Sequence, residues 1–380
     1  MERVAVIMGK MHSGGKKNLV MEYYRHIDRN KIQFDFICDS DSNAIPKEEI
    51  ESLGGRVYIV SPYQKIFRNI KEVKKILRDN EYKIVHGYNG TMNVFTMFAA
   101  KTCGVPIRIN ESISMGHIAD KKTYIKNILK PFSKLFSTHF MSNGETCGRW
   151  QFGDKAFEDG KVTVFKTVVD TEKHGYDIEL RKKCREELGL KDNIVFGHIG
   201  RLTEQKNTLF IIDIFKEIYD KEKKARLVII GDGNLREEMI QKINKEGLCE
   251  VILYLGRRED IHQFYNAFDA FLLPSLYEGL PVVGVEAQCS GLPMFFSTEI
   301  AKESSPCDDI GFFIDLAVGP RKWAEIVLQN TKANIDTRRD HRKEVCDAGF
   351  DSLLEGQKMS MWYLDEIYEE ERVSCCECID

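Results

Sequence analysis

Short apolar runs separated by longer amphipathic stretches constrain the fold of this chain more than any other feature. Between the runs, apolar residues recur at helical spacing, as at Leu19, Tyr23 and Ile27. Strands that alternate with helices predict a parallel sheet with helices on both faces. The first series of predicted strands comprises Val4–Met8, Phe34–Cys38, Val57–Val60, Ile84–His86, Ile107–Ile109 and Val162–Phe165.

A second series of strands follows a stretch dominated by charged residues, 170–192. The chain has 380 residues, and a single core rarely extends beyond roughly 300. We therefore predict two α/β domains, 1–175 and 176–355, then a helix over 356–372 and an irregular Cys-rich tail, 373–380. The second series comprises Ile194–Ile199, Leu227–Ile230, Ile252–Leu255, Phe271–Leu273, Met294–Phe296 and Phe312–Ile314.

Composition and charge narrow the possible classes of function. Hydrophobic residues make up 43% of the chain and charged residues 30%, which is typical of globular proteins. The 55 basic and 59 acidic residues give a net charge of -4, so we expect no nucleic-acid partner. The 11 cysteines are scattered, and no apolar window reaches the roughly 18 residues of a membrane-spanning helix. We expect reduced thiols and a cytoplasmic location.

Loops that follow strands are where ligands bind to open parallel sheets. After the first predicted strand, the loop 9–15 contains Gly14 and Gly15 and leads into a helix, whose N-terminus attracts anions. This loop either contacts a phosphate or a sugar, or forms only a tight turn. Asp39, after the second strand, is a candidate for a ribose or metal contact, or is an ordinary acid at a strand end.

The first strand of the second series ends near Gly200, and Arg201 and Lys206 follow it just before an amphipathic helix. Two cations placed between a strand and a helix N-terminus can converge on one anion. A diphosphate suits such a site, although exposed arginines and lysines are usually solvated surface residues. Gly231, after the next strand, lies in a turn that serves either the structure or a ligand contact.

The segment 273–293 gives the most specific signal. Pro281 suits the first turn of a helix, so Glu278 lies on the preceding loop and Glu286 within the helix. Glu286 stands among Val and Ala residues, where a carboxylate is costly to bury unless it accepts hydrogen bonds. The vicinal hydroxyls of a ribose or another sugar would donate them. A buried ion pair is the alternative.

Taken together, these motifs resemble the retaining glycosyltransferases of family 4, which have the GT-B fold. The resemblance implies two Rossmann-like domains with parallel sheets that face each other across a cleft, and a last helix that packs back toward the first domain. It rests on Gly14-Gly15, Gly200-Arg201 with Lys206, Gly231-Asp232-Gly233, and Glu278 with seven residues between it and Glu286. The segments Gly148-Arg149-Trp150 and Glu204-Gln205-Lys206-Asn207 are similar to bacterial transferases that build capsular polysaccharide or exopolysaccharide.

The resemblance also implies roles for individual residues. Arg201 and Lys206 would hold the diphosphate of a nucleotide sugar, expected to be a UDP-sugar, and Glu278 would hold the transferred hexosyl or N-acetylhexosaminyl group. Glu286 would bind the ribose hydroxyls. Such enzymes need no metal or other cofactor, and the acceptor hydroxyl attacks from the face that the nucleotide leaves, so no protein nucleophile is expected. The other residues expected around the donor are Gly14, Gly15, Gly200, Gly231, Gly279, Leu280 and Pro281.

Parts of the predicted first domain depart from the family pattern. Relatives often have Gly-Gly-x-Glu where this chain has Gly14-Gly15-Lys16-Lys17, and His-Ser-His where it has Glu111-Ser112-Ile113. We expect Glu111 and His117 on the side of the acceptor, a growing cell-surface polysaccharide or lipid-linked glycan. The changes leave open a catalytically weakened partner subunit that still binds nucleotide sugar. Gly14-Gly15 and Asp39 leave open a two-domain nicotinamide dehydrogenase, although the chain lacks GxGxxG.

One segment bears on location. The stretch 120–136 is either an ordinary amphipathic surface helix or a basic face that attaches the protein to anionic lipid at the inner face of the membrane. Each cation near such a surface contributes about 1 kcal/mol. The basic residues, which alternate with large apolar ones, are Lys121, Lys122, Lys126, Lys130 and Lys134.

Overall fold

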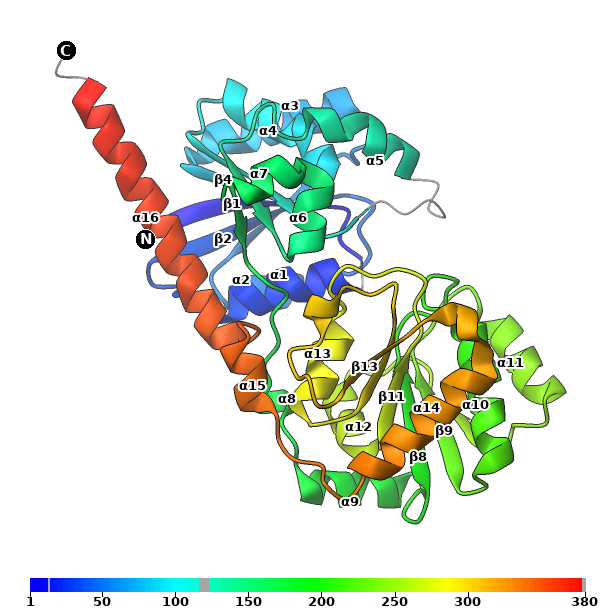
Figure 1. The fold of residues 1–380 in the computed structure, drawn as a ribbon. Helices are drawn as coiled ribbons and strands as arrows, with labels where there is room; N and C mark the ends of the chain where they lie inside the picture. The colour runs from blue at the N-terminus through cyan, green and yellow to red at the C-terminus, as the bar shows by residue number, and fades with distance from the viewer. Residues whose placement is uncertain (13, 116–122, 378–380) are drawn as a thin grey trace. The chain divides into compact units, whose positions relative to one another are not determined.

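The computed structural model of the protein describes residues 1–12, 14–115 and 123–377 and forms two compact units (Figure 1). Unit 1 is Met1–Val168 together with the chain from Ser352 onward, and unit 2 is Val169–Asp351. The boundary therefore lies seven residues before the predicted position, 175. The reason is local: the Val169 N–H donates to the Phe350 carbonyl (2.8 Å), and Thr171 Oγ1 donates to Asp351 Oδ2 (2.5 Å), which fixes residues 169–171 to unit 2.

Among the described residues, unit 1 contains a seven-stranded sheet in the order β3-β2-β1-β4-β5-β6-β7, with every neighbouring pair parallel. The sequence pattern missed β6, because its four residues have a His and a Ser at the ends and give no apolar run. The strands are β1 (Glu2–Gly9), β2 (Ile32–Asp39), β3 (Arg56–Val60), β4 (Ile84–Gly87), β5 (Ile107–Ser112), β6 (His139–Ser142) and β7 (Val162–Val164).

Different helices cover the two faces of this sheet, because successive side chains of a strand point to opposite faces. Val4 and Val6 of β1 pack in a core with residues of α1 (Gly15–His26) and α16 (Ser352–Glu377). Ala5 and Ile7 pack in a second core with residues of α3 (Ile66–Asn80) and α4 (Asn93–Thr102). The shorter elements of unit 1 are α2 (Lys47–Ser52), η1 (Gly90–Met92), α5 (Thr123–Leu129), η2 (Lys130–Phe132), α6 (Glu145–Phe152) and α7 (Asp154–Glu158).

The last helix, α16, returns the chain to unit 1, which confirms the prediction that it packs toward the first domain. The Tyr363 ring lies edge-on to Phe34 of β2, with ring centroids 6.0 Å apart. The Asp28 N–H donates to Ser360 Oγ (2.9 Å). The predicted bounds, 356–372, were too short: α16 begins at Ser352, and its backbone continues to Glu377 into the segment expected to be irregular. The glutamates at 369–371 end the apolar spacing but are good helix formers.

The sheet of unit 2 has six strands among the described residues, in the order β10-β9-β8-β11-β12-β13, again all parallel. Each of them was predicted, because each contains a run of apolar residues. They are β8 (Ile194–Ile199), β9 (Ala225–Ile230), β10 (Ile252–Tyr254), β11 (Ala270–Leu273), β12 (Met294–Ser297) and β13 (Gly311–Ile314).

Helices cover both faces of the second sheet as well. Phe196 and Leu272 share a core with α10 (Thr208–Lys221) and α14 (Gly319–Asn334). Val195 and Phe271, on the opposite face, share a core with α9 (Ile178–Glu187) and α12 (Ile261–Ala267). The remaining elements are α8 (Thr171–His174), α11 (Arg236–Lys245), α13 (Val282–Cys289), η3 (Lys302–Ser304), η4 (Leu316–Val318) and α15 (Arg342–Asp347). Two Rossmann-like units of this kind make up the GT-B architecture.

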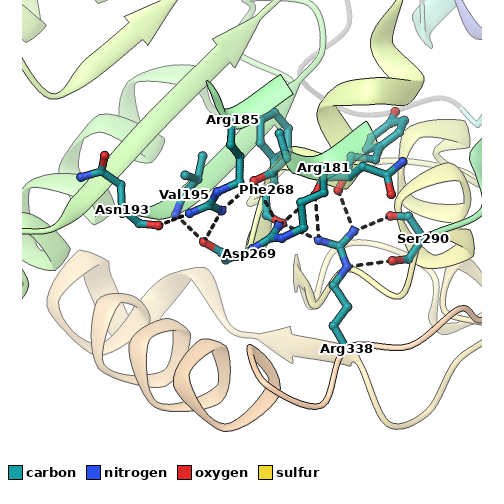
Figure 2. A network of polar contacts seen from close by, with 11 residues as sticks. Arg181, Arg185, Asn193, Val195, Phe268, Asp269, Ser290 and Arg338 are labelled. Atoms are coloured by element: carbon teal, nitrogen blue, oxygen red, sulfur yellow. Dashed lines mark hydrogen bonds and ion pairs between the residues drawn. The ribbon is translucent and has the colours of Figure 1, made fainter. Parts of the chain in front are cut away.

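Figure 2 shows a polar network that joins α9 to the starts of β8 and β11 in unit 2. Arg185 Nη1 donates to Asp269 Oδ2 (3.0 Å), the Val195 N–H donates to the same oxygen (2.7 Å), and Arg181 pairs with Oδ1. Arg338 donates to the Tyr265 carbonyl (2.7 Å) and to Ser290 Oγ (2.9 Å). Burial, reinforced by the nearby charge of Arg181, lowers the pKa of Arg338 to about 9. Because protein groups accept these hydrogen bonds, the network serves the structure of unit 2.

Candidate active site

Three loops at the carboxyl ends of β8, β9 and β11 meet in unit 2. The Gly200 N–H donates to the Ile230 carbonyl (3.0 Å), and the Leu202 N–H donates to the Asp232 carbonyl (3.1 Å). Gly231 has φ +141°, and a Cβ added there would lie 1.8 Å from the Gly200 carbonyl oxygen. Only glycine fits at position 231, so these strand-end glycines allow two loops to touch at the edge where ligands bind to parallel sheets.

The two cations predicted to bind a diphosphate have different surroundings. Arg201 is exposed, and its Nη2 donates to Gln205 Oε1 (3.0 Å). Lys206 is nearly buried, and its Nζ lies 2.6 Å from Glu278 Oε1. The structure thus brings together Lys206 and Glu278, two residues that are 72 positions apart and that the sequence pattern assigned to one site.

The loop that carries Glu278 is tied to the loop after β8. The Leu276 N–H donates to the Gln205 carbonyl (2.8 Å), and Gln205 Nε2 donates to the Tyr277 carbonyl (3.1 Å). Helix α13 begins at Val282, directly after Pro281, with no side-chain cap and no acidic residue in its first turn. Its free N–H groups give the end of the loop Gly279–Pro281 a partial positive charge, which favours an anion nearby.

Glu286 lies inside α13, as predicted, and its residue is 9% exposed. Tyr265 of α12 donates from its hydroxyl to Glu286 Oε2 (2.6 Å), and His174 Nε2 lies 3.7 Å from Oε1. Burial, and secondarily the charge of Glu286, raise the pKa of Tyr265 well above its ordinary value, so this hydroxyl stays a donor. The Tyr265 hydroxyl therefore holds one carboxylate oxygen in place, whereas the other has the more distant His174 as its partner among the described residues.

His198 also lies at this site, although the sequence pattern indicated no role for it. It is fully buried at the end of β8, and its Nδ1 lies 2.9 Å from the Leu272 carbonyl oxygen, to which it donates. Burial lowers its pKa to about 4, so the ring is neutral near pH 7. Nε2 has no hydrogen-bond partner in the described part of the chain, and a Cβ added at Gly200 would lie 3.2 Å from it. A histidine two residues before a strand-end glycine was the available signal.

The glycine-rich loop predicted to contact the donor belongs to unit 1. Gly14 has φ +146° and precedes α1, which begins at Gly15 without a side-chain cap. Lys16, in the first turn, donates from Nζ to the Met8 carbonyl (2.5 Å) and to Asn89 Oδ1 (3.1 Å). Asp39, at the end of β2, accepts from the Tyr63 N–H (3.1 Å). This loop and the strand ends beside it offer a cation and uncapped N–H groups.

Of the two residues expected on the acceptor side, the structure describes Glu111. Glu111 is 1% exposed, and its Oε2 lies 2.8 Å from His86 Nε2, while His86 Nδ1 lies 2.6 Å from the Tyr363 hydroxyl. The carboxylate therefore has a partner inside unit 1 and links β5 through β4 to α16. The sequence showed Glu111 after a predicted strand but gave no indication that His86 would be its partner. His117, the other expected residue, lies outside the described residues.

Comparison with known proteins defines the class to which this fold and site belong. Residues 181–303 match the family model described as "Glycosyl transferases group 1". A Bacillus subtilis (strain 168) protein named as the glycosyltransferase EpsF is 29% identical over 92% of this chain and 93% of its own. The Escherichia coli UDP-Gal:alpha-D-GlcNAc-diphosphoundecaprenol alpha-1,3-galactosyltransferase is 27% identical over 74% of this chain and 76% of its own.

Solved structures show the same architecture. Anabaena Alr3699/HepE, crystallised with UDP-glucose, matches 96% of this chain and 100% of its own with a TM-score of 0.75 at 17% identity. Sucrose-phosphate synthase of Thermosynechococcus elongatus matches 97% of this chain and 100% of its own, also with a TM-score of 0.75, at 14% identity. The protein is a glycosyltransferase with the GT-B fold. Neither the dehydrogenase nor the weakened partner subunit is favoured.

Proposed function

We propose that this protein transfers a hexosyl or N-acetylhexosaminyl group, with retention of configuration and without a metal, from a UDP-sugar to a hydroxyl of a growing polysaccharide or lipid-linked glycan. The observation that carries the proposal is the pairing of Lys206 with Glu278 at 2.6 Å, where the loops after β8 and β11 meet. The relatives support the substrates: the Escherichia coli protein named above uses UDP-Gal, and a Staphylococcus aureus relative, 24% identical over 86% of this chain and 90% of its own, is named for capsular polysaccharide biosynthesis.

The chemistry follows from where positive charge lies. As the bond between the sugar C1 and the phosphate oxygen breaks, negative charge grows on the departing UDP. Arg201, Lys206 and the N-terminus of α13 would stabilise that charge in place of a metal. The acceptor oxygen bonds to C1 on the same face, and its proton passes to a departing phosphate oxygen. In this assignment Glu278 orients the sugar hydroxyls and Glu286 the ribose.

A donor panel tests the proposal directly. The purified protein is incubated with UDP-glucose, UDP-galactose, UDP-N-acetylglucosamine and UDP-N-acetylgalactosamine, and released UDP is measured with and without a chelator. We expect one donor to give slow sugar release that the chelator leaves unchanged, with the released sugar first appearing as the donor's anomer by NMR. Release only after added divalent metal, inversion of the anomer, or no UDP binding by calorimetry would each contradict a stated part of the proposal.

We also propose peripheral contact of unit 1 with an anionic membrane through α5 and η2. Among the described residues, no helix is long and apolar enough to cross a bilayer. Several large apolar residues within 123–135 are at least half exposed: Tyr124, Ile125, Ile128, Phe132 and Leu135. Lysines stand between them, with Lys130 Nζ 5.1 Å from the centre of the Trp150 ring. Exposed apolar side chains among lysines are typical of helices that lie on membrane surfaces.

Vesicle sedimentation tests this contact. Binding to vesicles with anionic lipid should fall as salt is raised, and should fall severalfold when Lys126, Lys130 and Lys134 are replaced by Gln. A matched triple replacement of Lys242, Lys245 and Lys332 in unit 2 is the control. Equal binding of both triple variants, or equal binding to neutral vesicles, would refute the contact.

A further inference from the structure

Unit 1 contains a cavity of about 200 Å³ that the donor site of unit 2 does not use. Its rim includes Gly9 at the end of β1, Asp39 at the end of β2 and Asn89 just after β4. In the strand order β3-β2-β1-β4, connections run in opposite directions on the two sides of β1, so the β1–β4 edge is the topological switch point of the sheet. Open α/β sheets bind their ligands in the crevice at this point.

The walls of the cavity are mainly apolar. They come from the strands β1, β2 and β3 and from α3, η1, α4 and α5, so several separate elements form the cavity. Its volume lies below the roughly 300 to 1,000 Å³ of pockets that enclose a whole small-molecule ligand, so it suits one portion of a larger molecule. The apolar lining residues are Ile7, Ile37, Val60, Ile66, Val73, Met92, Phe95 and Ile125.

Lys16 is a cation in this wall that forms no salt bridge within the described residues. Its Nζ donates to two neutral acceptors, the Met8 carbonyl and Asn89 Oδ1. Asp39, which also lines the cavity, is near enough for its charge to act on Lys16, but it accepts neither of these hydrogen bonds. Burial lowers the pKa of Lys16 to about 8 and outweighs the opposing effects of Cys38 and Asp39. An anion placed beside Nζ would restore its ordinary pKa.

The other charged side chains at the cavity also have ion-pair or hydrogen-bond partners. Lys10 Nζ lies 2.7 Å from Asp41 Oδ2. Asp39 accepts from the Tyr63 N–H and, more weakly, from Asn69 Nδ2 (3.4 Å). Lys126 Nζ donates to the Met115 carbonyl (3.1 Å). The first turn of α1, where Lys16 lies, contains no acidic residue that would oppose an anion.

We propose that this cavity is an acceptor subsite, in which Lys16 binds a phosphate or carboxylate group carried on a body with apolar surface. The proposal rests on the transferase function proposed above, because it assigns the anionic group to the acceptor. Two sources share this chemistry: the phosphate next to an isoprenoid chain in a lipid-linked acceptor, and the carboxylate of an acidic sugar, whose ring has an apolar face. Lys16 occupies the x position of the Gly-Gly-x-Glu pattern that relatives often have.

Calorimetric titration in the absence of any donor tests the subsite. The probes are geranyl diphosphate with geraniol as its neutral counterpart, and methyl glucuronide with methyl glucoside as its neutral counterpart. We expect one anionic probe to bind the wild-type protein and to bind Lys16→Gln at least about tenfold more weakly. Lys16→Arg should recover part of the affinity. Lys17→Gln, which removes the adjacent charge of the same turn from outside the cavity lining, should bind like wild type.

The pH dependence gives a second readout that a merely structural role would not change. Affinity for the anionic probe should fall as pH rises through about 8, where Lys16 in the free protein loses its proton, and Lys16→Gln should abolish that dependence. Titration of the diphosphate itself is complete below this range. The titratable groups that surround Lys16 are Lys10, Cys38, Asp39, Asp41, Tyr63 and Lys126.

The outcomes that contradict the subsite differ from the one that contradicts the proposed function. Binding of neither anionic probe, equal binding of a charged probe and its neutral counterpart, or equal loss in Lys16→Gln and Lys17→Gln would overturn the subsite. A loss of UDP affinity in Lys16→Gln would also overturn it, because Lys16 would then serve the donor. Failure of the wild-type protein to bind UDP would instead count against the proposed function, since the probe titrations contain no nucleotide.

Discussion

Lys206 Nζ lies 2.6 Å from Glu278 Oε1, and each side chain is 11% exposed. The two residues proposed to hold different parts of the donor therefore hold each other in the free protein. An arriving diphosphate would replace Glu278 beside Lys206 and leave the carboxylate free to accept from sugar hydroxyls. Removal of either partner leaves the other charge nearly buried and unpaired, which is costly. The pair thus keeps both groups in place until the donor arrives.

Lys206→Gln should lower kcat by about 10²- to 10³-fold, because the lost charge stabilises the departing UDP more than the bound donor. Released UDP, measured at saturating donor, provides the test. Lys191→Gln, which removes an exposed lysine before β8, is the matched control. A variant with raised KM and unchanged kcat would show that Lys206 only binds the donor.

Tyr265→Phe should raise the KM for the UDP-sugar about tenfold and leave kcat nearly unchanged. The hydroxyl donates to Glu286 Oε2 at 2.6 Å, and without it the carboxylate is less well placed for the ribose. Steady-state kinetics with varied donor measures the effect. Tyr219→Phe, at a ring that packs on Phe215, should change neither constant. Unchanged KM in both variants would remove Glu286 from the proposed ribose site.

Asp269→Asn should lower the free energy of unfolding by about 3 to 5 kcal/mol, because it leaves Arg181 and Arg185 without their shared carboxylate. The midpoint of denaturant unfolding, followed by a fluorescent probe on unit 2, reports the change. Asp220→Asn removes a mostly exposed carboxylate near Lys223 and should shift the midpoint little. Equal midpoints for the two variants would mean that the network in Figure 2 contributes no net stability.

The protein should lose stability in acid partly through His198. Its pKa is lowered to about 4 in the folded state, against about 6.5 in an unfolded chain, because burial favours the neutral ring. The stabilisation is therefore complete above pH 6.5 and is lost as pH falls toward 4, by up to about 3 kcal/mol. Unfolding midpoints at pH 7 and 4.5 measure it. His198→Asn should narrow the difference between them, whereas replacement of the exposed His12 should not.

The sequence predicted the parts of the fold that depend on apolar periodicity. Twelve strands of the described residues were located because each contains a run of apolar residues, whereas β6 was missed because His139 and Ser142 bound it. The start of α13 after Pro281 was also predictable, because proline suits the start of a helix for local steric reasons. Local patterns were therefore sufficient for most of the architecture.

Contacts between distant residues were not predictable in the same way. Nothing near Glu111 in the sequence points to His86, which pairs with it across neighbouring strands. The choice of Tyr265 as donor to Glu286 depends equally on how α12 packs beside α13. The sequence shows Lys16 in the glycine-rich loop, but its two neutral hydrogen-bond partners became evident only from the packing of β1 and β4 around it.

The path of the chain has a consequence for biosynthesis. Unit 2 is one uninterrupted segment, whereas unit 1 is completed by α16, which is synthesised only after unit 2. Ribosomes add about 5 to 20 residues per second, so synthesis of unit 2 takes roughly 10 to 40 seconds. Throughout this time, the face of the first sheet that α16 covers remains without its last helix. During that interval Phe34 lacks the ring of Tyr363 beside it. A nascent chain in which unit 2 has folded but α16 has not yet formed would thus combine a complete unit 2 with an incomplete unit 1, a species suited to chaperone binding.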